Sequence, residues 1–169
     1  MKAQKINIGK QAKKARANYN SWIKKYQGVL ATVGIVLVND DGKILLEKRK
    51  NWPFTEYWCI PGGHIDRMEK ASMSILRETR EETGFIVKDL QFIGYDDEII
   101  PGIKWHRVML AFTGKAKGGK IKVDAAEVYE AKFFSPGEIS RLRMAFNHKS
   151  IIKNFLKVGN TSKMLRWNK

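Results

Sequence analysis

Three glutamates, Glu78, Glu81 and Glu82, lie close together in a segment whose residue pattern predicts a helix. At about 100° per residue, their side chains share an arc of roughly 100° on one helix face. Glu78 and Glu82 are like charges four positions apart, and all three acids lie near the C-terminal end, where the helix macrodipole favours cations. Arg77 and Arg80 offset part of this charge, so a solvated surface face is one interpretation. A bound divalent cation is the other.

The second interpretation points to phosphate chemistry. Mg²⁺ prefers hard oxygen ligands, takes few carboxylates, and fills its remaining positions with water and substrate phosphates. No cluster of His and Cys competes for a softer metal, since the chain has three His and one Cys. Ahead of the predicted helix, Pro61-Gly62-Gly63 allows unusual backbone angles and close approach of the main chain to a ligand.

From Gly63 to Phe85 the sequence resembles the Nudix box, G-x5-E-x7-R-E-U-x-E-E-x-G-U, in which U is bulky and aliphatic. The one departure is Thr79, where the family more often has Leu, Ile or Val. Segments 58–63 and 130–134 also resemble the family. The resemblance implies an α/β (α+β) fold, the Nudix-type α/β/α sandwich with a mixed β-sheet between helices. It also implies Mg²⁺- or Mn²⁺-dependent hydrolysis of a nucleoside diphosphate linked to another moiety X.

The resemblance implies roles for the matching positions. The metal ligands would be the three acids of the helix face with one backbone carbonyl: Glu78, Glu81, Glu82 and Gly62. Arg77 would hold a glutamate of the box in place.

Two further positions of the box would support the loop. They are Gly63 and Glu69, and helical spacing places Glu69 about 180° from Glu78.

A general base is needed to activate water, and a carboxylate beside a metal is suitable. Glu82 and Glu81 are candidates within the box. Family members often use an acid from a later loop, where Asp124, Glu127 and Glu130 lie in this chain. We favour Glu127, because Glu130 is predicted to enter a strand.

Substrate contacts are predicted from aromatic and basic side chains near the box: Lys48, Arg49, Trp52, Phe54, Tyr57, His64 and Trp105. The aromatic members can stack on a base, and the basic ones can meet phosphates. Packing in the protein's own core is the alternative for each aromatic residue. The moiety X stays open between ADP-ribose-like compounds and modified nucleoside triphosphates.

The elements that must position these residues are predicted from periodicity and turn signals. Strands are expected over residues 30–38, 43–48, 85–95, 103–113 and 130–134, with a short strand before Pro61. Helices are expected over 11–26 and 69–83, and from Pro136 and Asn147. Within 69–83, the face opposite the acids carries Met73, Ile75, Leu76 and Thr79 and is expected to pack on the sheet. This order predicts a mixed sheet covered by helices.

The net charge of +15 is concentrated in the two ends of the 169-residue chain. Residues 1–28 and 141–169 each carry eight Lys or Arg and no acid, whereas 29–140 has 16 bases and 17 acids. We predict a basic N-terminal helical arm (1–28), a Nudix hydrolase domain (29–158) and a basic C-terminal tail (159–169). The basic ends suggest an alternative hypothesis, an RNA-associated protein acting on a cap or RNA end.

Composition narrows the remaining expectations. No apolar run reaches the roughly 20 residues that a membrane span needs, and no secretory signal is visible. Cys59 is the only cysteine, so no internal disulfide is expected. We therefore expect a cytoplasmic enzyme acting on a small nucleotide, without a membrane partner. Whether it forms a homodimer is left open.

Overall fold

The computed structural model describes residues 28–103 and 105–159. In chain order the elements are β1 (Leu30–Val38), β2 (Ile44–Arg49), β3 (Trp58–Cys59), α2 (Ala71–Thr83), β4 (Ile86–Ile100), β5 (Trp105–Lys117), β6 (Val128–Phe134), α3 (Pro136–Ile139) and α4 (His148–Gly159). The helix predicted over 11–26 and nearly all of the predicted tail lie outside the described residues.

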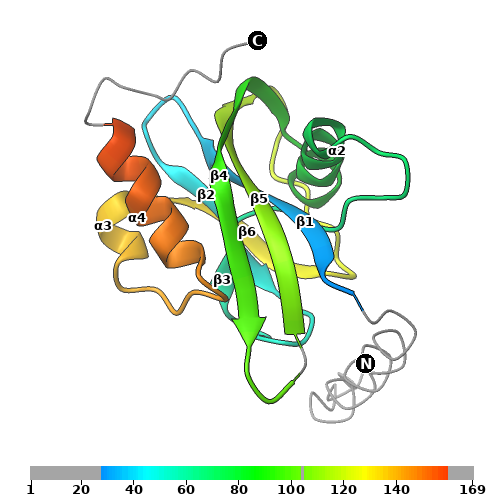
Figure 1. Cartoon of the computed structure of the whole chain (residues 1–169). Coiled ribbons are helices and arrows are strands. Elements are labelled where there is room, and N and C mark those ends of the chain that lie inside the picture. Colours follow the sequence, from blue (N-terminus) through cyan, green and yellow to red (C-terminus); the bar gives the residue numbers. More distant parts are fainter. Residues whose placement is uncertain (1–27, 104, 160–169) are drawn as a thin grey trace, which may run out of the picture.

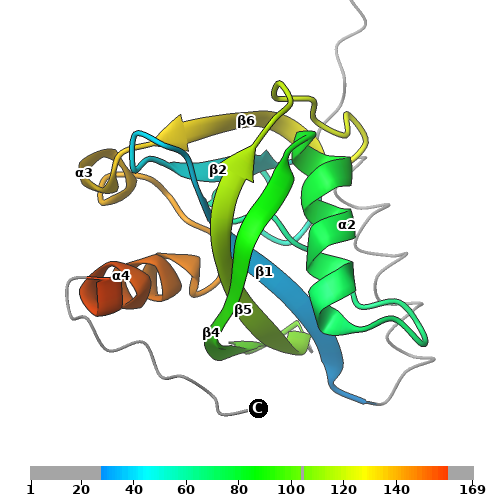
Figure 2. The ribbon, with the colours of Figure 1, turned by 90° about the horizontal axis from the view of Figure 1, so that it is seen from above.

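One mixed sheet of six strands forms the centre of the described part of the chain. Its strand order is β3-β2-β1-β5-β4, and β6 also pairs with β2. β1 runs parallel to β5 along its whole length, and the other pairs are antiparallel. Helix α2 covers one face of the sheet, and α3 and α4 cover the other (Figure 1 and Figure 2). This confirms the predicted α/β/α sandwich.

Both faces of β1 are buried, because successive side chains of a strand point to opposite faces of the sheet. Val33 and Ile35 pack in a hydrophobic cluster with Ile75 of α2. Val36 packs in a second cluster with Ile152 of α4. The largely apolar sequence of β1 is therefore that of a central strand covered on both sides.

Helix α2 begins two residues later than predicted, so Glu69 lies in the loop before it. It ends as predicted at Gly84, whose φ of 78° is the left-handed conformation favoured by glycine. Thr79, the departure from the family pattern, is fully buried. Its hydroxyl donates to the Ile75 carbonyl at 2.6 Å, so the polar group is satisfied within the helix.

The hairpin of β4 and β5 is longer than predicted. The two strands pair from Ile86↔Lys117 to Ile100↔Trp105. Both strands therefore run past the C-terminal ends predicted for them from the sequence. In the turn that follows β5, Gly118 and Gly119 have positive φ. The helix predicted from Pro136 has only four residues.

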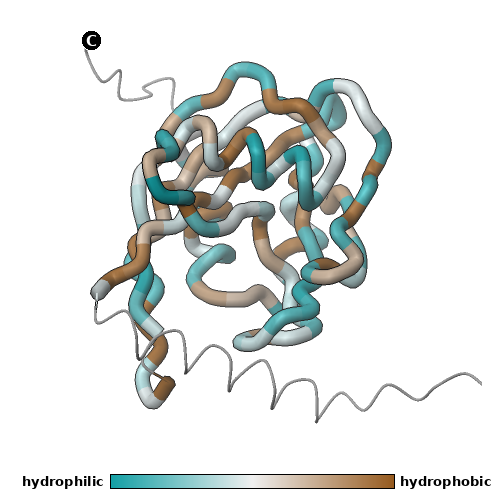
Figure 3. Tube along the Cα trace, turned by 90° about the vertical axis from the view of Figure 1, so that its right-hand side faces the viewer, coloured by the Kyte–Doolittle hydropathy of each residue, from teal (hydrophilic) through white to brown (hydrophobic). Residues whose placement is uncertain are grey.

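Hydrophobic and hydrophilic positions alternate at short intervals along much of the chain trace (Figure 3). Within residues 28–103 and 105–159, no helix is both long and apolar enough to cross a membrane.

Met73 of α2 was predicted to pack on the sheet, and this prediction is wrong. Met73 is 56% exposed, whereas Ile75, two positions later, is fully buried. The physical reason is that α2 contacts the sheet through a narrow stripe, and Met73 falls beyond its edge.

This difference gives a test of the packing. We expect Ile75→Ala to lower the free energy of unfolding by about 2–5 kcal/mol, because it leaves a cavity between α2 and the sheet. Met73→Ala is the matched control on the same helix and should change it by less than about 0.5 kcal/mol. Urea unfolding followed by circular dichroism measures both. Equal effects would contradict the observed packing of α2.

Candidate active site

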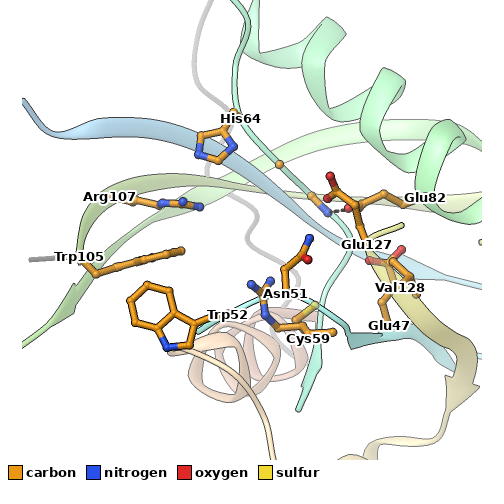
Figure 4. A pocket seen from close by; sticks show the side chains of 13 residues that line it. Glu47, Asn51, Trp52, Cys59, His64, Glu82, Trp105, Arg107, Glu127 and Val128 are labelled. Atoms are coloured by element: carbon orange, nitrogen blue, oxygen red, sulfur yellow. Dashed lines mark hydrogen bonds between the residues drawn. The ribbon is translucent and has the colours of Figure 1, made fainter. Parts of the chain in front are cut away.

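A cavity of about 240 Å³ lies where β2, the loop after β3, the end of α2, and the starts of β5 and β6 meet. Its lining residues are Glu47, Arg49, Asn51, Trp52, Cys59, Gly62, Gly63, His64, Glu82, Trp105, Arg107, Glu127 and Val128. Figure 4 shows two ends: Glu47, Glu82 and Glu127 gather at one, and His64, Arg107, Trp105 and Trp52 at the other.

The Pro-Gly-Gly loop lies directly along β1. Ile35 N–H donates to the Pro61 carbonyl and Val33 N–H donates to the Gly63 carbonyl, both at 2.9 Å. A Cβ on Gly62, whose φ is 152°, would stand 2.1 Å from the Val33 carbonyl oxygen. Glycine is therefore required at position 62 by both backbone angle and space.

Both glycines also bring the loop against helix α2. The Gly62 N–H donates to Glu82 Oε2 at 2.9 Å. A Cβ on Gly63 would come within 2.5 Å of the Glu78 carboxyl group. A larger residue at position 63 would therefore fit only if Glu78 moved away.

Arg77 holds three of the glutamates that follow the glycine loop. It binds Glu69 through two hydrogen bonds, Nη2 to Oε2 at 2.8 Å and Nε to Oε1 at 3.0 Å. It also contacts Glu78 at 2.9 Å and Glu81 at 3.3 Å. The hydrogen bonds from Arg77 lower the pKa of Glu69 to about 2. Arg77 thus contacts three glutamates of the box at once.

Glu47 and Glu82 form a buried pair of carboxyl groups. Glu47 is 2% exposed and Glu82 is 8% exposed. Burial raises the pKa of Glu47 to about 8, against the lowering effects of its hydrogen bond with Glu82 and of the Arg49 charge. Burial and the neighbouring Glu47 charge raise the pKa of Glu82 well above its usual range.

Glu47 was missed by the sequence analysis, which treated residues 43–48 only as a hairpin strand. A signal was present: Glu47 directly follows three apolar residues, Ile44, Leu45 and Leu46, all fully buried. An acid that continues a fully buried strand must face either a partner or a site.

Glu127 lines the rim of the acidic end, directly before β6. Its charge contributes to the raised pKa values of Glu47, Glu78 and Glu82. Of the other late acids, Asp124 caps the turn by accepting from Ala126 N–H at 2.7 Å. Neither Asp124 nor Glu130 is among the cavity's lining residues, so the geometry supports the choice of Glu127.

The opposite end of the cavity combines aromatic rings with a cation. The Arg107 guanidinium carbon lies 3.6 Å from the centroid of the Trp105 ring, and Trp52 meets Trp105 edge-on at 6.4 Å. Burial, and next the Arg107 charge, lower the pKa of His64 to about 4, so His64 is neutral at physiological pH. Arg107 was not singled out from the sequence.

Several predicted site residues lie outside the cavity's lining. Phe54 packs on Tyr57 and Phe146, with ring centroids 5.4 and 5.0 Å away, and Tyr57 lies under the Arg143 guanidinium. Lys48 of β2 and Glu78 and Glu81 of α2 are also not among the lining residues, although the Glu78 carboxyl group lies against Gly63. Of the predicted substrate residues, the structure brings together Arg49, Trp52, His64 and Trp105.

The Pro-Gly-Gly loop is also supported from the α4 side. The supporting residues, His148 and Glu98, were not suggested by the sequence. Ile60 N–H donates to His148 Nδ1 at 3.2 Å, and His148 Nε2 lies 3.1 Å from Glu98 Oε1. Because Nδ1 accepts a hydrogen bond, Nε2 carries the proton that is donated to Glu98. Burial raises the pKa of Glu98, but the His148 contact and the Arg107 charge together lower it by more. The net shift of the Glu98 pKa is therefore downward.

The acidic end has the chemistry of a hard-cation site, since carboxylate and carbonyl oxygens suit Mg²⁺ and Mn²⁺. Glu47 Oε1 is buried without a hydrogen-bond partner, and coordination to a cation would satisfy this oxygen. Within the described ranges, no three His, Cys, Asp or Glu side chains are already grouped as metal ligands. Arg77 explains part of this, because it draws Glu78 and Glu81 toward itself.

Comparisons with known proteins agree with this geometry. Residues 29–155 match the family model of the NUDIX domain. An ADP-ribose pyrophosphatase of Methanocaldococcus jannaschii is 33% identical over 137 residues, covering 80% of this chain and 79% of that protein. An RNA pyrophosphohydrolase of Wolbachia sp. subsp. Brugia malayi is 30% identical, covering 73% of this chain and 87% of that protein. The solved NUDIX domain of Shewanella oneidensis NrtR, complexed with ADP ribose, has a TM-score of 0.71 and 24% identity, covering 84% and 97% of the two chains.

The buried acid pair predicts a pH dependence of stability without metal. Since the folded-state pKa of Glu47 is about 8 against 4.5 for the free group, its contribution is fully present below pH 4.5 and is lost as pH rises toward 8. His64, with its lowered pKa, changes stability in the opposite sense, but only below about pH 6.5. We therefore expect the free energy of unfolding to fall between about pH 6.5 and 8.

The measurement is urea unfolding in EDTA at several pH values. Glu47→Gln should flatten the decline, whereas Glu56→Gln, an exposed control outside the cavity, should leave it unchanged. A Glu47→Gln protein with the same pH slope as the original would contradict the assignment.

Proposed function

The chain belongs to the NUDIX family, and from that premise we propose that it hydrolyses the pyrophosphate linkage of an ADP-ribose-like nucleoside diphosphate. The observation that carries the proposal is the division of one cavity into an acidic end and an aromatic, cationic end (Figure 4). A diphosphate joined to a ring system needs both kinds of surface, one for its charge and one for its ring. The similarity to an ADP-ribose pyrophosphatase over most of both chains supports this substrate class.

The cavity size is consistent with partial enclosure of such a molecule. Pockets that enclose a drug-sized ligand are about 300–1,000 Å³, and this cavity is about 240 Å³. A nucleoside diphosphate bound here would have its diphosphate and one ring inside, with the rest of the molecule extending beyond the rim.

The residues proposed to hold Mg²⁺ or Mn²⁺ are the acids of α2 with the loop carbonyl: Glu78, Glu81, Glu82 and Gly62. When bound, the cation neutralises phosphate oxygens and lowers the pKa of coordinated water. Arg77 fixes Glu78 and Glu81 through contacts of 2.9 and 3.3 Å. The Gly62 N–H fixes Glu82.

Proton transfer from the attacking water is assigned to a carboxylate at the same end. Glu127 is the proposed general base, because it lines the cavity while its residue remains exposed and free to adjust. Glu82 and Glu81 remain alternatives within the box. Water attacks one phosphorus of the pyrophosphate, and the bond to the bridging oxygen breaks.

The opposite end is proposed to bind the base or the second ribose. Trp52 offers a ring surface for stacking, and Arg107 and Arg49 offer charge to phosphate oxygens. Trp105 is 3% exposed and contacts Arg107 and Phe146, so it supports this end of the cavity. His64 is neutral there and can exchange hydrogen bonds without adding charge.

A second candidate function is hydrolysis at an RNA 5′ end. It is favoured by the 16 bases, with no acid, in residues 1–28 and 141–169. It is also favoured by the similarity to an RNA pyrophosphohydrolase. Binding of RNA through these ends would weaken steeply with rising salt.

The test is a panel of substrates with Mg²⁺ or Mn²⁺: ADP-ribose, 8-oxo-dGTP, dinucleoside polyphosphates and RNA with a 5′ triphosphate. We expect ADP-ribose to give the highest kcat/KM, with AMP as a product. Glu82→Gln should reduce kcat by about a hundredfold or more, because it removes one charge from the metal face. Glu56→Gln is the matched control and should be active.

Faster cleavage of RNA than of ADP-ribose, lost at high salt, would favour the second candidate. No cleavage of any substrate by the wild-type protein would overturn the proposed function.

The aromatic end can be tested separately. We expect Trp52→Ala to raise KM for the preferred substrate by roughly 5- to 100-fold, since base stacking on an aromatic side chain contributes about 1–3 kcal/mol. Tyr57→Phe removes only a hydroxyl outside the cavity, one that contacts Arg143, and should leave KM within about twofold. Steady-state kinetics distinguish these outcomes. An unchanged KM for Trp52→Ala would place the ring of the substrate elsewhere.

A further inference from the structure

Glu47 is an acid in the interior of a central strand. It is 2% exposed, it follows three fully buried apolar residues, and it lines the acidic end of the cavity. Its Oε1 atom is buried without a hydrogen-bond partner. A buried, unpaired carboxylate oxygen costs free energy and is normally found only where a partner binds.

The nearby arginines make their hydrogen bonds to other groups, although the Arg49 charge also acts on Glu47. Arg49 donates from Nε to the Pro53 carbonyl at 3.2 Å, and its guanidinium lies 4.9 Å from the Phe146 ring centroid. Arg77 is taken up by Glu69, Glu78 and Glu81. The two buried carboxyl groups therefore share one end of the cavity without a bound arginine.

We propose that Glu47 is a direct ligand of the divalent cation and forms with Glu82 a two-carboxylate site bridging β2 and α2. The proposal rests on the proposed function, because it assigns a ligand outside the Nudix box to the same metal. Mg²⁺ and similar ions are usually held by one or two carboxylates plus substrate phosphates and water. Two carboxylates are therefore enough protein ligands for such an ion. Among the described residues, no group of three or more His, Cys, Asp or Glu side chains is placed to hold a metal.

The position of Glu47 in the sheet makes it a rigid ligand. It pairs with Cys59 of β3 on one side and with Ala131 of β6 on the other. A side chain on a strand held from both sides is positioned more exactly than one at a helix end or in a loop. Figure 4 shows the Glu47, Glu82 and Glu127 side chains at the same end of the cavity.

The experiment is Mn²⁺ titration of the metal-free full chain, followed by calorimetry and by electron paramagnetic resonance of free Mn²⁺. Loss of residues that merely orient metal ligands already costs about 10- to 100-fold in affinity, so Glu47→Gln should weaken Mn²⁺ binding at least about tenfold. Glu47→Asp keeps the charge but shortens the reach, and it should also weaken binding. Glu56→Gln should bind as the wild-type protein does.

A second measurement guards against misfolding. In EDTA, at a pH high enough to ionise Glu47, Glu47→Gln should unfold at a higher temperature than the wild-type protein, because burying a neutral amide costs less free energy than burying a carboxylate. A variant that is more stable without metal but binds Mn²⁺ more weakly cannot be explained by loss of the fold.

The outcomes separate this proposal from the proposed function. If Glu47→Gln binds Mn²⁺ within twofold of wild type, Glu47 is not a ligand, while metal-dependent hydrolysis by the wild-type protein would still stand. If Glu47→Asp binds normally and Glu47→Gln does not, Glu47 acts only through its charge, and the direct ligand role is overturned. If the wild-type protein binds no Mn²⁺ and cleaves no substrate, both proposals fail.

Discussion

Burial of carboxyl groups is the constraint around which the candidate active site is arranged. Arg77 neutralises one group of acids by contacts with Glu69, Glu78 and Glu81. The second group, Glu47 and Glu82, is buried, and its raised pKa values show that ionisation of both is unfavourable without a cation. The buried pair therefore favours a bound positive charge, whereas Glu69, Glu78 and Glu81 already share the Arg77 guanidinium.

The glycine loop makes this arrangement possible because it allows the backbone of β1 and the side chains of Glu78 and Glu82 to approach the loop closely. Its carbonyls accept hydrogen bonds from β1, its Gly62 N–H binds Glu82, and Gly63 leaves room for the Glu78 carboxyl group. The loop is supported from the other face of the sheet by the His148 ring, which accepts from Ile60 N–H. Residues nearly ninety positions apart thus fix the same short turn, and the fold serves chiefly to hold it against α2.

Much of the local structure could be predicted from the sequence. The strand β1 and the end of α2 at Gly84 follow from side-chain period and glycine chemistry, which act over a few residues. Predictions failed where tertiary contacts decide. Met73 lies at the edge of the packed stripe, and the ends of β4 and β5 are set by their pairing with each other. The aromatic residues predicted to contact substrate do not all reach the cavity. Trp52 lines it, whereas Phe54 packs on Phe146.

The sequence by itself determined the family, the α/β/α sandwich and the helix that carries the box acids, because that information lies in fixed spacings along one segment. Only the tertiary structure decided which side chains share the cavity. Glu47 on β2 and Arg107 on β5 join Glu82 there although nothing in their local sequence links them. The physical reason is that strand order and register bring distant residues together, and pairing of this kind leaves no periodic signal in the sequence.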